Sequence, residues 1–154
     1  IADLSEATRL APTFSGAFAN LASAREKSGD LAGALRDIDE ALRLLPGSWN
    51  SHHLRAGLRR KLNDDTGALA DYNKAIELYP SASSYYIDRA LLKRKLRDFT
   101  GALTDYNKAI ELEPGIAETY RARATVRKGT GDEAGAKADF AKAVELEAAA
   151  AKKS

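Results

Sequence analysis

The four prolines of this chain stand 34 residues apart, at Pro12, Pro46, Pro80 and Pro114. The phrase TGALADYNKAIELYP at residues 66–80 returns at residues 100–114 with two changes. Self-similarity at a fixed period of this length is typical of repeat architectures, in which each unit is one supersecondary motif. We therefore interpret the 154 residues as an array of similar units. Other residues that keep the interval are Gly33, Gly67, Gly101, Gly135 and Asp37, Asp71, Asp105, Asp139.

Each period contains the pattern of two helices. In residues 66–80 the apolar side chains recur at three- and four-residue spacings, which favours one buried helical face over the alternation of a strand. An earlier helix, for instance at 83–96, completes a motif of helix, tight turn and helix. A short acidic residue precedes the second helix of every copy, where it can accept hydrogen bonds from the first free amides. These predicted caps are Asp30, Asp64, Asp98 and Asp132.

Three sets of alanines predict where the helices cross. An alanine at a crossing point lets two backbones approach closely, because protein interiors are packed too tightly to absorb extra methylenes. We expect larger aromatic residues, among them Tyr106 and Phe140, to fill the space beside each crossing. The alanines are Ala22, Ala56, Ala90, Ala124, then Ala34, Ala68, Ala102, Ala136, then Ala41, Ala75, Ala109, Ala143.

The chain resembles the tetratricopeptide repeat family. It shares the 34-residue helical hairpin, an early aromatic residue, small residues at the crossings, the phrase ALxDYxxAIxLxP and a closing proline. The resemblance covers essentially the whole chain and implies an all-α fold, a right-handed superhelical solenoid of antiparallel helix pairs. Alanine replaces the glycine common in the family's first helix, and His52 takes the early aromatic position of the second copy.

Four repeats are predicted, at residues 13–46, 47–80, 81–114 and 115–148. Residues 1–12 match the second half of a preceding copy, so we interpret them as a second-helix remnant and expect either a fragment of a longer array or a disordered beginning. In the last copy Lys137 replaces a stacking leucine, which suits a terminal repeat with a polar outer face. The array is expected to end there, with residues 149–154 as a helical or frayed tail.

Composition excludes several classes of function. The formal net charge is only +2, so it does not by itself indicate nucleic acid or an anionic membrane as partner. There is no cysteine for a disulfide, a thiolate nucleophile or a zinc-thiolate site. No apolar run approaches the roughly 20 residues that cross a bilayer. The style of the repeats suggests a soluble bacterial protein, either cytoplasmic or periplasmic.

Catalytic motifs are not found. His52 and His53 are the only histidines, and adjacent helical residues point about 100° apart, so they cannot share a metal ion. We expect His52 to pack and His53 to face solvent or the groove. The run KGTGDEAGAK at residues 128–137 matches no phosphate-binding motif, and no GxSxG elbow is present. The sequence predicts a protein that is not an enzyme and that has no cofactor and no metal site.

The resemblance assigns the binding surface to a concave face formed by the first helices of successive repeats. In the first copy the equivalent face carries small residues and Glu26. The lysine and asparagine clamp by which some family members grip a peptide carboxylate is missing. The predicted groove residues are Asn50, His53, Gly57, Arg60, then Ser84, Ile87, Leu91, Arg94, then Glu118, Arg121, Thr125 and Lys128.

Basic triplets lie at the end of three first helices, and stacking would align them into a ridge. One interpretation is a binding site for an acidic peptide, or less plausibly for a nucleic-acid backbone; the other is that these charges only keep the surface soluble. The triplet residues are Arg59, Arg60, Lys61, then Lys93, Arg94, Lys95, then Arg127, Lys128.

A second charge pattern joins the arginines at 55, 89 and 123 to the repeating aspartates of the second helices. The Asp of one repeat could pair with the Arg of the next, or the two could pair within one hairpin. The first arrangement is preferred, and either would orient the stack.

These features together predict a scaffold for protein–protein interaction that binds a peptide segment of a partner. Two alternatives stay open. One is self-assembly, in which the half-hairpin at residues 1–10 packs on another chain. The other is a targeting arm of a larger enzyme.

Overall fold

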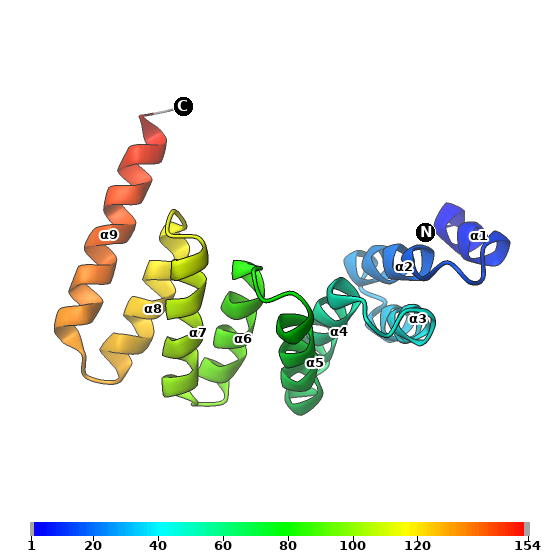
Figure 1. The fold of residues 1–154 in the computed structure, drawn as a ribbon, viewed down its shortest axis with the longest axis horizontal. Helices are drawn as coiled ribbons and strands as arrows, with labels where there is room; N and C mark the ends of the chain where they lie inside the picture. Colours follow the sequence, from blue (N-terminus) through cyan, green and yellow to red (C-terminus); the bar gives the residue numbers. More distant parts are fainter. Residues whose placement is uncertain (1, 153–154) are drawn as a thin grey trace. The chain divides into compact units, whose positions relative to one another are not determined.

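The computed structural model describes residues 2–152, and every regular element of this part is a helix, which confirms the predicted all-α class. Figure 1 shows the helices in chain order. They are α1 (Ala2–Leu10), α2 (Ser15–Ser28), α3 (Leu31–Leu44), α4 (Trp49–Lys61), α5 (Asp65–Leu78), α6 (Ser83–Lys95), α7 (Phe99–Leu112), α8 (Ala117–Gly129) and α9 (Glu133–Ala151).

The chain divides into two compact units, Ile1–Pro80 with α1 to α5 and Ser81–Ser154 with α6 to α9. In the first unit α2 pairs with α3 and α4 with α5; in the second, α6 pairs with α7 and α8 with α9. Each pair is a hairpin of antiparallel helices. Ile1 of the predicted remnant and residues 153–154 of the predicted tail lie outside the described residues.

The start of each second helix is capped as predicted. The side chain of Asp30 accepts a hydrogen bond from the Gly33 amide at 2.8 Å, and the three other capping aspartates repeat the contact at 2.8–2.9 Å. A Cβ atom built on Gly33 would lie 2.0 Å from a carboxylate oxygen of Asp30. The repeating glycine is therefore needed because the capping side chain folds directly over it.

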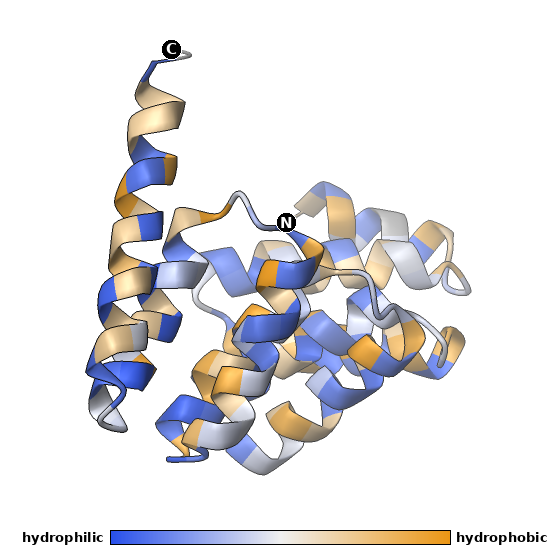
Figure 2. Ribbon diagram, turned by 60° about the vertical axis from the view of Figure 1, so that its left-hand side comes forward, coloured by the Kyte–Doolittle hydropathy of each residue, from blue (hydrophilic) through white to orange (hydrophobic). Residues whose placement is uncertain are grey.

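The crossing alanines are confirmed as core residues, since each is at most 2% exposed. They let neighbouring hairpins share an interior: Ile38 of α3 packs in one cluster with Leu58 of α4, and Tyr106 of α7 packs with Val126 of α8. Figure 2 shows the resulting alternation of apolar and hydrophilic residues along the helices. Inserting a larger side chain at such a crossing would cost about 1–3 kcal/mol.

The last helix departs from this pattern. Phe140 is 37% exposed, whereas Tyr106 at the equivalent position of the preceding hairpin is fully buried. Phe140 is thus less completely packed than we expected, because no described helix covers its outer side. Lys137 is exposed on the same helix, and α9 continues to Ala151. No helix in residues 2–152 has the length and apolar character that a bilayer span requires.

Candidate functional site

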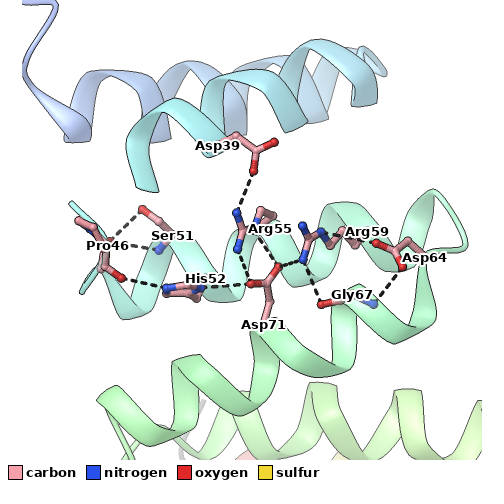
Figure 3. Close-up of polar contacts among 10 residues, drawn as sticks. Asp39, Pro46, Ser51, His52, Arg55, Arg59, Asp64, Gly67 and Asp71 are labelled. Atoms are coloured by element: carbon pink, nitrogen blue, oxygen red, sulfur yellow. Dashed lines mark hydrogen bonds and ion pairs between the residues drawn. The ribbon is translucent and has the colours of Figure 1, made fainter. Parts of the chain in front are cut away.

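A buried carboxylate lies at the centre of each hairpin that α4, α6 or α8 begins. Asp71 of α5 receives two hydrogen bonds from Arg55 of α4, at 2.8 and 2.7 Å, and one from Arg59 at 2.8 Å (Figure 3). Asp105 is bound in the same way by Arg89 and Lys93, and Asp139 by Arg123 and Arg127.

These pairs form within a hairpin, so the preferred prediction of pairing between repeats is wrong. The reason is the helical period. Arg55 and Arg59 are four residues apart, so they lie on one face of α4, and this face packs on α5 where Asp71 is buried.

One guanidinium also reaches the preceding hairpin. Nη1 of Arg55 donates to Asp39 of α3 at 2.8 Å, and Nη1 of Arg123 donates to Asn107 of α7 at 2.7 Å. Arginine can make both contacts at once because its planar fork carries five donors. The link between repeats therefore exists, but it uses an exposed residue two positions beyond the repeating aspartate.

The first hairpin lacks one of the two cations. Leu21 of α2 stands where Arg55 stands in the second hairpin, and Asp37 has Arg25 as its ion-pair partner, with Nη1 2.8 Å from Oδ2. That contact lacks hydrogen-bond geometry, so the buried oxygen accepts no hydrogen bond. Burial raises the pKa of Asp37 above its usual range, although Arg25 opposes the shift.

Asp71 behaves in the opposite way. Burial opposes its charge, but hydrogen bonds from Arg55 and His52 outweigh this effect and hold the pKa of Asp71 below its usual range. The same interaction raises the pKa of Arg55.

His52 is polar in its contacts rather than a simple packing residue. Its Nδ1 lies 3.1 Å from Oδ1 of Asp71, and its Nε2 lies 3.0 Å from the carbonyl oxygen of Pro46 (Figure 3). The next residue, His53, places its ring 5.6 Å from that of Tyr72. Within residues 2–152 no three His, Asp or Glu side chains are grouped so as to hold a metal ion.

The basic triplets are not uniform. Their first members, Arg59, Lys93 and Arg127, are bound by the buried aspartates. Lys61, a third member, pairs with Glu26 of α2 at 3.0 Å. The predicted ridge is therefore partly neutralised by the protein itself.

The middle members of the triplets differ from their neighbours. No carboxylate of the described chain lies within 4.0 Å of Arg60, Arg94 or Lys128. The Nε atom of Arg60 is buried and has no hydrogen-bond partner among the described residues. These three cations can therefore meet an external anion without breaking an internal pair.

The structure places the predicted groove residues in both units. Asn50, His53, Gly57 and Arg60 belong to α4 of the first unit, and the other eight belong to α6 and α8 of the second. Ile87 and Leu91 are half-buried on α6. Arg121 is held by Glu147 at 2.9 and 2.7 Å, which leaves it less available than predicted.

Sequence reasoning missed the second cation of each buried site. Its signal was present, because Arg25, Arg59, Lys93 and Arg127 also stand 34 residues apart. Grouping them with the adjacent basic residues as one ridge hid their separate role.

Comparison with known proteins agrees with this architecture. The family model for the tetratricopeptide repeat matches residues 50–81 and 83–116. A crystal structure of MamA superimposes with a TM-score of 0.91 at 19% identity, covering 97% of this chain and 87% of that one. MamA residues 41 to the end from Desulfovibrio magneticus RS-1 give 0.87 at 19% identity, covering 95% and 82%. At this identity the likeness shows the fold alone, a solenoid of helix pairs. No curated protein matches the sequence.

Proposed function

Since this chain is a tetratricopeptide-repeat protein, we propose that the first helices of each unit bind an acidic peptide segment of a partner protein. Tetratricopeptide repeats serve as scaffolds for protein–protein interaction. The observation that carries the finer proposal is the division of labour within the basic triplets. One cation of each triplet neutralises a buried aspartate, and the next, at Arg60, Arg94 or Lys128, has no carboxylate beside it.

Charge complementarity gives such cations a role in recognition. A carboxylate of the partner would form charge-assisted hydrogen bonds with the guanidinium of Arg94 or the ammonium of Lys128. Solvated charges that already have internal partners contribute little to specificity, because binding would first have to break those pairs. This reasoning favours the middle cations over the rest of the ridge.

Apolar side chains supply the second part of the surface. Ile87 and Leu91 lie one and two turns before Arg94 on α6, and both are half-buried. We infer that the second unit favours a peptide in which apolar residues accompany the acidic ones. Because folded helices present these groups, part of the ordering cost of binding is already met.

The test selects peptides of twelve random residues that bind the whole chain displayed on a surface. The expected result is enrichment of Asp and Glu, with affinities that fall as salt rises because charge pairs near the surface are screened. The triple variant R60E/R94E/K128E should lose at least about tenfold in affinity for the selected peptides, which is about 1.4 kcal/mol.

A matched control separates local recognition from net charge. The variant K27E/K137E/K152E makes the same total charge change at exposed lysines outside the groove, and it should bind almost as well as the wild type. Equal losses in both triple variants would contradict the proposal, as would a selection that enriches no acidic residues.

Self-association is a second candidate, supported by exposed apolar residues near the beginning of the chain. Leu10 at the end of α1 is 69% exposed, and Phe14 just before α2 is 60% exposed. If they mediate assembly, the mass measured by sedimentation should rise with concentration for the wild type and stay constant for L10S/F14S. A wild-type mass that does not change with concentration would rule this candidate out.

A further inference from the structure

His52 joins two segments of the first unit that are far apart in the sequence. One ring nitrogen faces the carboxylate of Asp71 on α5, and the other faces the carbonyl of Pro46 in the turn between α3 and α4 (Figure 3). The side chain is only 12% exposed, so water cannot easily replace either contact. The imidazole therefore connects the second hairpin to the end of the first.

Both partners of this imidazole can only accept hydrogen bonds. The backbone carbonyl of Pro46 has no proton to donate, and Asp71 is ionised because two arginines bind it. A neutral imidazole has one N–H, so it satisfies one partner and turns a lone pair toward the other oxygen. The imidazolium has two N–H groups, which is the number that this geometry requires.

The charges around His52 point the same way. Without a proton on His52, the connected cluster contains three carboxylates and two guanidiniums, so it carries one uncompensated negative charge. An imidazolium brings the cluster to neutrality. From α3 the group involved is Asp39, from the turn before α5 Asp64, from α5 Asp71, and from α4 itself Arg55 and Arg59.

The other repeats have a different solution at this position. Tyr86 and Tyr120 stand at the equivalent positions of the third and fourth repeats, and the guanidiniums of Arg89 and Arg123 lie over their rings at 5.7 and 5.6 Å. A tyrosine can thus occupy the site without any change of charge. The histidine is specific to the second repeat.

We propose that His52 takes up a proton when the first unit folds and acts as a proton-dependent latch between the α3–α4 turn and α5. Folding then binds more protons than the unfolded chain does, so the latch is strongest at mildly acidic pH and is lost as the pH rises. Loss of the proton removes one of the two hydrogen bonds and leaves the cluster negatively charged. This device is independent of the peptide-binding proposal.

Nitrogen-15 NMR of the imidazoles in the whole chain tests the proposal directly. The expected spectrum at pH 7 shows two protonated ring nitrogens for His52, whereas His53, the adjacent histidine, titrates separately and serves as the internal control. A His52 ring that is a single neutral tautomer at pH 7, or that titrates together with His53, would overturn the proposal. This measurement does not depend on any variant folding correctly.

Urea denaturation of matched variants tests the consequence for stability. From pH 6 to pH 8 the folding equilibrium constant of the wild type should fall about tenfold more than that of H52Y, which carries the residue of the third and fourth repeats. The variant H53N should keep the wild-type dependence. Parallel profiles for the wild type and H52Y would contradict the latch.

Discussion

Asp37 and Asp71 occupy equivalent positions in the first and second hairpins, yet their surroundings shift their pKa values in opposite directions. Burial raises the pKa of Asp37, while the cations and the histidine around Asp71 lower that of the second carboxyl. Both side chains are buried to a similar degree. The difference lies in α2 and α4, because Leu21 in the first hairpin replaces the arginine that binds Asp71 twice in the second.

The comparison shows that the fold preserves the buried carboxylate more strictly than its compensation. A buried charge is costly unless it is paired and hydrogen-bonded. In the second hairpin, two guanidiniums satisfy the carboxylate and depend on it in turn. In the first, one oxygen of Asp37 accepts no hydrogen bond. The same residue is therefore a structural necessity in one hairpin and a weak point in its neighbour.

The largest expected effect comes from neutralising each carboxylate. Asp71→Asn leaves Arg55 and Arg59 half-buried without their counter-charge and should destabilise the chain by about 3 kcal/mol. Asp37→Asn removes an incompletely compensated charge and should change the free energy of unfolding by less than about 1 kcal/mol. Urea denaturation of both variants at pH 7 measures the difference. Similar losses in the two variants would show that the hairpins do not differ in the way described.

A smaller effect is expected when the second hairpin is given the pattern of the first. Arg55→Leu removes the two hydrogen bonds to Asp71 and the contact with Asp39, and it should cost about 2 kcal/mol. The pKa of Asp71 should then rise, which carboxyl-carbon NMR can follow. Arg36→Leu, at an exposed site, is the control and should stay within about 0.5 kcal/mol of the wild type. An unchanged Asp71 titration in Arg55→Leu would mean that Arg59 and His52 suffice.

The smallest effect sharpens the comparison through pH. Asp37 has a raised folded pKa, so its ionisation reduces stability as the pH rises through that value; relative to Asp37→Asn, the wild type should gain stability as the pH falls toward about 3.9, the ordinary value for Asp. Asp71 has a lowered folded pKa, so its contribution is present above the unfolded value and is lost as the pH falls through the folded one. Denaturation midpoints of each Asn variant against the wild type, from pH 7 to pH 3, should diverge in opposite directions. Curves of the same slope for both pairs would refute the assignment.

Much of the fold could be predicted from particular residues. The alanines at 22, 34 and 41 and their counterparts are buried because only a small side chain fits where two helices cross, and this requirement is visible in the sequence as a 34-residue spacing. The capping aspartates were equally readable, since a cap depends on residues three positions apart in the chain. Local geometry and the repeat interval carry this information.

The site was only partly predictable. Position 60 was correctly separated from the apolar face, but nothing in the sequence distinguishes the bound guanidinium of Arg59 from that of Arg60 beside it. Which of two adjacent cations meets a buried carboxylate depends on how α4 is rotated against α5. The direction of the Arg55 pair was wrong for the same reason, because both arrangements satisfy the same spacing.

The sequence by itself determined the period, the helix pairs, the small residues at their crossings and the caps, because each of these depends on neighbours a few residues away or on an exact recurrence. Only the tertiary structure decided which charges neutralise one another and which stay without a carboxylate partner. Side-chain electrostatics depend on distances between helices that are 12 to 26 residues apart in the chain, and a few ångströms of position separate a buried ion pair from a solvated cation.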